Sequence, residues 1–329
     1  MLKKFLLTLL SVMIMPFFAS AQNINGAGAS FPYPVYSAWA YYYEKAHKLR
    51  VNYQSIGSGG GIKQITEGTV DFGATDEPLS EAELKKANLT QFPAITGGIV
   101  VIVNIDGLKK AKLVLDGSTT ADIFLGKITK WNDPKIAALN KSLNLPDQKI
   151  TVIRRSDSSG TTAVFTKYLS ESSDEWNKTV GTGKSVNWKT GLGAKGNDGV
   201  TNLVRQTKNS IGYTEFTYAE QAKVSYTSLV NKSGSIVEAS LNSFSIAASG
   251  TDWTKSSVYA VSLTNSNDKN AWPIVAASFI LVRNDRPEVK ARVMNFFKFA
   301  FEQGDNTAKA LKYVPLPANL KTEISSKIK

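Results

Sequence analysis

The sequence predicts an α/β protein of two lobes, each a mainly parallel sheet flanked by helices, with two strands as hinges between the lobes. Three observations lead to this architecture. Strand-like and helix-like segments alternate along the chain, the loops between them are short, and two uncharged apolar runs stand far apart, at 94–105 and 272–282. Runs of this kind are typical of strands buried on both faces. We expect them to carry the chain from one lobe to the other and back.

The first part of the chain follows this alternation closely. It predicts a helix over 34–46, a strand over 50–56, a helix over 62–67, a strand over 69–74, a helix over 80–87 and the long strand over 94–105. Ser80 and Glu83 have the spacing of a capping box, which supports the helix that they begin. Glycine-rich segments precede the helices at 34 and 62, and we expect both segments to be loops.

The rest of the chain repeats the pattern and sets the expected lobe boundaries. Helices are predicted over 119–125, 160–169, 217–222 and 287–302, and strands over 149–155, 211–214 and 272–282. Since the chain leaves the first lobe near Val103 and returns near Ile274, lobe I is expected to comprise 22–103 plus 274–329. Lobe II is then 104–273. Two such lobes can hinge and hold a ligand between them.

The N-terminus has the features of a cleaved secretory signal. Lys3 and Lys4 precede an uncharged apolar run over 5–18, and the small residues of 19–21 follow it. The run has 14 residues, fewer than the ~20 that a membrane-spanning helix needs. We therefore expect residues 1–21 to be a signal peptide and the mature chain to be periplasmic, with an uncleaved membrane anchor as the alternative.

Composition excludes several kinds of site. The chain has no Cys and a single His, which excludes thiolate metal sites, thiol nucleophiles and His-pair metal sites, so neither a metal nor a cofactor is expected. The formal net charge is +12, which favours anionic partners. Lys and Arg are nevertheless scattered, without a basic run interleaved with aromatics. Nucleic acid is therefore not an expected partner.

Three segments with the same chemistry predict an oxyanion site. Residues 26–32, 57–61 and 155–162 are rich in small and hydroxyl-bearing residues, and each directly precedes a predicted helix. A helix N-terminus presents unpaired N–H groups and partial positive charge to an anion. Arg155 adds a full charge in a fork suited to phosphate, sulfate or carboxylate. Taken singly, such a segment is more often only a helix cap or a turn.

Two carboxylates narrow the choice of anion. Asp76 follows the strand predicted at 69–74, and Asp157 lies two residues after Arg155. A carboxylate in an anion site accepts a hydrogen bond from a protonated phosphate, whereas sulfate at neutral pH has no proton to donate. We interpret Asp76 as that acceptor and Asp157 as the partner that orients Arg155. The alternative for both aspartates is a turn or a helix cap.

Together these segments resemble the periplasmic phosphate-binding proteins of phosphate ABC importers. The matching motifs are residues 26–32, 56–60, 70–76, 126–133, 154–161 and 191–199. We interpret 196–199 as structural. The family commonly has Ala and Gly at the positions of Ser156 and Ser158, and the missing glycine matters if the backbone needs a positive φ there. The resemblance covers nearly the whole mature chain.

The resemblance implies a type II periplasmic binding protein fold that encloses desolvated phosphate between its lobes. Carried over by motif position, the binding residues are Ser30, Phe31, Ser58, Asp76, Arg155, Ser159, Gly160 and Thr161, with Asp157 supporting Arg155. The implied partners are inorganic phosphate and an inner-membrane ABC permease with its cytoplasmic ATPase. The implied protein is a monomer and not an enzyme.

Two other functions remain open from sequence. A binder of sulfate or another tetrahedral oxyanion would use the same helix N-termini, although Asp76 disfavours it. A secreted phosphatase would use Ser58 or Ser159 as nucleophile, which requires a base or metal cluster that the three segments lack.

Overall fold

The computed structural model describes residues 23–106, 108 and 113–327. The predicted signal peptide, residues 1–21, lies outside this range. Among the described residues, no helix is both long enough and apolar enough to cross a membrane.

The described residues form twelve strands, thirteen α-helices and one 3₁₀ helix. The strands are β1 Ile24–Gly28, β2 Val51–Ser55, β3 Phe72–Thr75, β4 Leu89–Asn104, β5 Val114–Leu115, β6 Thr151–Arg155, β7 Leu192–Ala194, β8 Ser210–Glu215, β9 Ser225–Tyr226, β10 Ser228–Val230, β11 Ile236–Val237 and β12 Val275–Arg283. The helices are α1 Tyr33–His47, α2 Ser58–Glu67, α3 Glu81–Ala87, α4 Gly117–Phe124, α5 Pro134–Leu139, α6 Gly160–Ser172, α7 Asp174–Thr179, α8 Gly196–Gln206, α9 Phe216–Ala222, α10 Leu241–Ser249, η1 Trp253–Lys255, α11 Pro287–Gln303, α12 Asp305–Ala310 and α13 Ala318–Lys327.

Within this part of the chain, nine strands form one sheet in the order β2-β1-β3-β12-β4-β8-β6-β7, with β9 paired to β4. The pairs of β1 with β2 and β3, and of β6 with β7 and β8, are parallel. Every pair that includes β4 or β12 is antiparallel. The prediction of mainly parallel sheets is therefore wrong for the middle of the sheet, because a continuous apolar run indicates burial on both faces but not strand direction.

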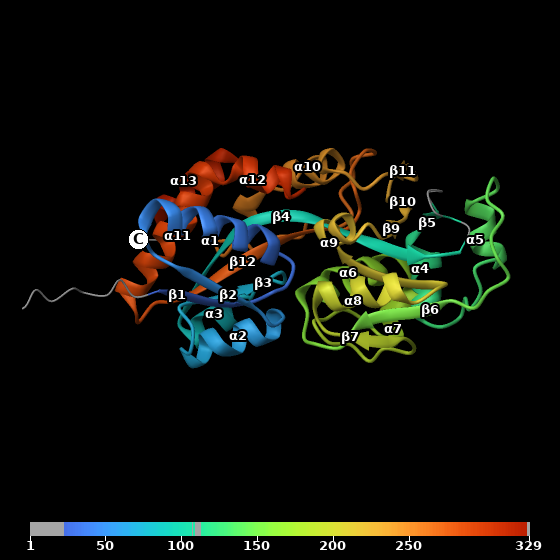
Figure 1. The fold of residues 1–329 in the computed structure, drawn as a ribbon, viewed down its shortest axis with the longest axis horizontal. Coiled ribbons are helices and arrows are strands. Elements are labelled where there is room, and N and C mark those ends of the chain that lie inside the picture. Colours follow the sequence, from blue (N-terminus) through green and yellow to red (C-terminus); the bar gives the residue numbers. More distant parts are fainter. Residues whose placement is uncertain (1–22, 107, 109–112, 328–329) are drawn as a thin grey trace, which may run out of the picture.

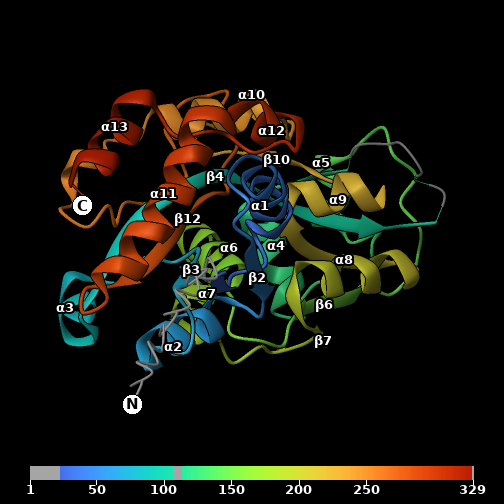
Figure 2. The ribbon, with the colours of Figure 1, turned by 60° about the vertical axis from the view of Figure 1, so that its left-hand side comes forward.

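Strand β4 connects the two ends of the molecule. Its residues 89–98 pair with β12, and its residues 99–104 pair with β8. Figure 1 shows β4 running along the long axis from the region of α1 and α11 to the region of α4. Figures 1 and 2 show α1 and α11 on one side of β1 and β3 and α2 on the other. A separate sheet in the order β11-β10-β5 lies at the end far from β1.

Most predicted elements are confirmed to within a few residues, and the capping box of Ser80 and Glu83 at the start of α3 is present. The glycine-rich segments are the exception. Residues 26–28 belong to β1, and 58–61 form the first turn of α2 instead of a loop. The reason is close packing, since a Cβ on Gly61 would lie 2.5 Å from the Cα of Gly28. These glycines let α2 lie directly on β1.

Phe297 of α11 packs at the centre of the core between α1, α11 and strands β3 and β4. Its ring contacts the rings of Tyr36, Phe72, Phe92 and Phe296 at centroid distances of 4.8–5.6 Å. The contacts come from α1, β3, β4 and α11, so one side chain joins both helices to the sheet that they cover.

We predict that Phe297→Ala lowers the free energy of unfolding by about 3–5 kcal/mol, because it leaves a cavity where four rings meet. Urea unfolding followed by circular dichroism measures the change. Tyr42→Ala serves as the control, since that ring is 50% exposed and its loss should cost about 0.5 kcal/mol or less. Equal losses in the two variants would contradict this account of the core.

Candidate functional site

The N-terminal turns of α2 and α6 meet directly, although their residues are about a hundred positions apart in sequence. The Gly160 N–H donates to Ser58 Oγ at 3.0 Å, and the Gly59 N–H donates to the Ser158 carbonyl at 3.1 Å. Both helices follow parallel strands, so their N-termini lie at the carboxyl edges of those strands. This is where ligands bind in open α/β sheets.

Asn197, at the start of α8, ties the N-terminal segment of α1 to the same place. Its backbone N–H and its Nδ2 donate to Ser30 Oγ at 3.1 and 3.0 Å, and Nδ2 also donates to Thr161 Oγ1 at 3.2 Å. Residues 196–199 are among the matching motifs, but the sequence predicts no contact between Asn197 and the site residues. Its side chain meets Ser30 only through tertiary packing, so local sequence could not indicate the contact.

The serine hydroxyls of the site keep their protons available. Ser30 Oγ accepts two hydrogen bonds from Asn197, and Ser58 Oγ accepts from the N–H groups of Asp76 (3.3 Å) and Gly160 (3.0 Å). Each hydroxyl has one proton to donate. Because N–H donors occupy the oxygens, that proton remains free for another acceptor. Two buried hydroxyls with free protons suit a ligand that is rich in acceptor oxygens.

Arg155 forms a buried fork with Asp157. Nε and Nη2 of Arg155 donate to the two carboxylate oxygens at 2.7 and 2.5 Å. Burial opposes the charge of Asp157, but Arg155 and the Gly196 N–H outweigh it and hold the pKa of Asp157 below its usual value. Nη1 of Arg155 is buried without a hydrogen-bond partner among the described residues. The sequence-based pairing of Arg155 with Asp157 is confirmed, and one guanidinium nitrogen remains for a ligand.

Asp76, just after β3, supplies an unpaired hydrogen-bond acceptor, as Arg155 supplies an unpaired donor. Its side chain is buried, and Oδ1 has no hydrogen-bond partner within the described part of the chain. Burial raises the pKa of Asp76 to about 7, against the lowering effects of the Ser278 hydroxyl, the Arg155 charge and the Thr161 hydroxyl. An unpaired buried acceptor of this kind costs about 1–3 kcal/mol. A ligand that donates to Oδ1 would remove that cost.

The glycine at position 160 lets the start of α6 pack closely against α2 and against Asp76. A Cβ at this position would lie 2.6 Å from Ser58 Oγ and 2.7 Å from Asp76 Cβ, so only glycine fits. Ser158, in contrast, is not among the described residues with positive φ. A serine in place of the glycine common in the resembling family therefore requires no backbone strain there.

All the predicted binding residues are buried: Ser30, Phe31, Ser58, Asp76, Arg155, Ser159, Gly160 and Thr161. The structure brings Ser58, Asp76 and Gly160 into contact and links Ser30 to Thr161 through Asn197. Two groups already have partners. The Gly160 N–H donates to Ser58, and Ser159 Oγ caps α6 by accepting from the Thr162 N–H at 3.1 Å.

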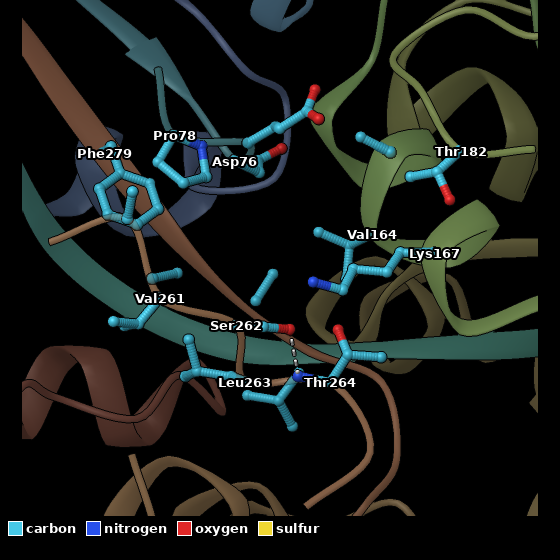
Figure 3. A pocket seen from close by; sticks show the side chains of 16 residues that line it. Asp76, Pro78, Val164, Lys167, Thr182, Val261, Ser262, Leu263, Thr264 and Phe279 are labelled. Atoms are coloured by element: carbon cyan, nitrogen blue, oxygen red, sulfur yellow. Dashed lines mark hydrogen bonds between the residues drawn. The ribbon is translucent and has the colours of Figure 1, made fainter. Parts of the chain in front are cut away.

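A cavity of about 220 Å³ lies beside this cluster (Figure 3). Of the predicted site residues only Asp76 lines it, together with Val164 and Lys167 of α6, the segment 260–264, and Phe279. Among the described residues, no group of three or more His, Cys, Asp or Glu side chains is placed to hold a metal ion.

Comparison with known proteins shows the family of the chain. A family model described as PBP superfamily domain matches residues 19–303. A phosphate-binding protein PstS of Haemophilus influenzae is 52% identical, with 95% of this chain and 94% of the relative covered. The PstS of Pasteurella multocida is 51% identical, with coverages of 93% and 92%.

Solved structures share the fold at lower identity. A phosphate-bound high affinity periplasmic phosphate-binding protein, PfluDING, superimposes with a TM-score of 0.73 at 19% identity, covering 93% of each chain. A phosphate-bound substrate-binding protein of a putative phosphate ABC transporter from Clostridium perfringens gives 0.66 at 21% identity, covering 90% of this chain and all of that one. The chain belongs to the PBP superfamily and, within it, to the PstS family of phosphate-binding proteins.

Proposed function

We propose that this protein binds inorganic phosphate between two lobes and delivers it to the permease of an ABC importer. The curated relatives covered along more than nine-tenths of their length are named phosphate-binding proteins. A structural neighbour from Vibrio cholerae is an ABC-type phosphate transport receptor. The protein acts in this proposal as a binding protein and not as an enzyme.

The observation that carries the proposal is the pair of unpaired polar atoms in one buried site. Arg155 Nη1 has a proton and positive charge to offer, and Asp76 Oδ1 has a lone pair to offer. A ligand that satisfies both must accept a hydrogen bond from Arg155 and donate one to Asp76, and the positive charge of Arg155 favours an anion. Dihydrogen or hydrogen phosphate meets both requirements, and sulfate at neutral pH meets only the first. Ser30, Ser58, Thr161 and the segment at Phe31 supply further donors in this proposal.

Two lobes that close on the ligand fit the contacts. Strand β4 belongs to one lobe up to Gly98 and to the other from Ile99, where its pairing partner changes. Hydrogen bonds from Asn197 to Ser30 and the ion pair of Lys184 with Glu77 (2.8 Å) then cross between the lobes. The proposed division differs from the sequence-based one in its boundaries.

One segment expected in lobe II is assigned to lobe I. The carbonyl of Val258 accepts from Gln91 Nε2 at 2.9 Å, and the Tyr259 hydroxyl contacts Glu323 at 3.2 Å. Gln91 and Glu323 lie in β4 and α13. Residues 256–259 therefore belong to lobe I in this proposal. The sequence-based boundary at 274 does not mark the return of the chain to lobe I. It marks a point where the chain runs alongside β4.

Cellular location follows from the same proposal. The predicted signal peptide over 1–21 and the periplasmic neighbour PfluDING support a periplasmic protein. The partners are an inner-membrane permease with its cytoplasmic ATPase, and the protein is a monomer that binds no nucleic acid and requires no cofactor.

Equilibrium titration of the purified wild-type protein tests the function. We expect one phosphate per chain, weak competition by sulfate, and no hydrolysis of p-nitrophenyl phosphate. Binding of sulfate as tight as that of phosphate would favour a general oxyanion binder. Measurable turnover would instead support the phosphatase hypothesis.

We predict that Asp76→Asn narrows the preference for phosphate over sulfate by at least about tenfold. The amide removes the repulsion between a carboxylate and an unprotonated oxyanion and can donate to it. Competitive calorimetry with both anions measures the ratio. Asp71→Asn is the matched control, because Asp71 accepts from the Asn25 N–H outside the site. An unchanged preference in Asp76→Asn means that Asp76 does not contact the ligand.

Arg155→Ala should weaken phosphate binding at least about 30-fold, the effect of the 2–5 kcal/mol typical for truncating one side of a buried charged pair. The substitution also leaves Asp157 without its partner. Arg283→Ala is a close control, since Arg283 makes the same two-bond fork with Asp285 two residues later, near the surface. Calorimetric titration should find that control unchanged, whereas similar losses in both variants would point to general destabilisation.

A further inference from the structure

A second buried carboxyl, Glu215, lies between the proposed lobes and outside the proposed phosphate contacts. It is the last residue of β8 and is fully buried. Oε2 lies 3.0 Å from the Tyr313 hydroxyl, and Oε1 accepts from the Thr217 N–H at 3.0 Å. Tyr313 follows α12 in lobe I, whereas Glu215 and Thr217 belong to lobe II.

Both hydroxyls beside Glu215 also contact backbone carbonyls at shorter distances. The Tyr313 hydroxyl donates to the Phe31 carbonyl at 2.6 Å, and the Thr217 hydroxyl donates to the Leu311 carbonyl at 2.6 Å. A carbonyl can only accept, and a hydroxyl has a single proton. Tyr313 therefore has no proton left for Glu215, and the contact is a hydrogen bond only if Glu215 supplies the proton.

We propose that Glu215 is a positioning residue that takes up a proton when the lobes close, and through Tyr313 holds the Phe31 segment in place for phosphate. This inference rests on the proposed function. The protonated carboxyl donates through Oε2 to Tyr313, while Oε1 accepts from the Thr217 N–H. Tyr313 then donates to Phe31, whose segment begins α1 at the site. The Glu215 N–H also donates to Asn197 Oδ1 at 3.3 Å, which connects the carboxyl to the residue that holds Ser30 and Thr161.

The electrostatic surroundings agree with a neutral carboxyl. Burial, with a smaller contribution from the Asp76 charge, raises the pKa of Glu215 to about 8 against the lowering effect of the hydrogen bond from the Thr217 N–H. The titratable groups that face it are Tyr313, Tyr218 of α9 and Asp76 after β3. Each of these is neutral or negative, so none stabilises a carboxylate by opposite charge.

The direction of the pH effect follows from linkage. In an open protein Glu215 would be parted from Tyr313 and Leu311 and would titrate near the ordinary glutamate value of ~4.3. Between that pH and about 8, closure on phosphate takes up a proton. The wild-type affinity, relative to a variant without this proton, therefore falls as pH rises through this range and is constant outside it.

Calorimetry of phosphate binding at pH 6.5, in buffers of different ionisation enthalpy, tests the inference. The wild type should take up about one proton more per phosphate than Glu215→Gln, whose amide is neutral in both states. The titration of phosphate is common to both proteins and cancels in the difference, and that of Asp76 cancels apart from its small coupling to Glu215. Glu81→Gln, which removes an exposed carboxyl on α3, should behave as the wild type.

A second variant keeps the test informative if Glu215→Gln does not fold, as judged by circular dichroism. Tyr313→Phe should weaken phosphate binding about tenfold, because the Phe31 carbonyl loses its donor. Where both variants fold, the loss in the double variant should be smaller than the product of the single losses. Equal proton uptake by the wild type and Glu215→Gln, or an unchanged affinity of Tyr313→Phe, overturns the inference alone. Absence of phosphate binding by the wild type overturns the proposed function as well.

Discussion

The structure depends on placing one guanidinium and one carboxyl out of water, each with a polar atom left unpaired. Two nitrogens of Arg155 donate to Asp157. Among the described residues, Arg155 Nη1 and Asp76 Oδ1 have no hydrogen-bond partner. Leaving such groups unsatisfied is costly in a buried setting. The cost is offset when a single ligand accepts at one point and donates at the other. The proposed selectivity for phosphate follows from this pairing more than from the size or charge of the site.

The rest of the fold brings these groups together. Strands β1, β2 and β3 run in one direction and β6 runs in the opposite direction on the other half of the sheet, and the helices that follow β2 and β6 bring their N-terminal turns together. Small residues allow the approach, most clearly at Gly160, where a Cβ would collide with Ser58 and Asp76. Strand β4 passes through both halves of the sheet. One part of this continuous sheet therefore carries Ser30 and Ser58, and another part carries Arg155 and Thr161.

Much of this arrangement could be predicted from sequence, for identifiable reasons. Helix periodicity and a capping box located α1 and α3, and hydroxyl-rich segments before helices indicated Ser58 and Thr161. Strand direction could not be predicted, because apolar runs do not encode it. Neither could the helical state of 58–61, since glycine there serves close packing and not a turn. Asn197 and Glu215 were missed because their contacts with Ser30 and Tyr313 span 167 and 98 positions of the chain.

The most direct test of the central claim is a neutron crystal structure of the phosphate complex in deuterated solvent. The account predicts a deuterium between one phosphate oxygen and Asp76 Oδ1, and a hydrogen bond from Arg155 Nη1 to another oxygen of the same anion. A complex in which phosphate lies away from Asp76, or in which Oδ1 faces an oxygen with no deuterium between them, would contradict it.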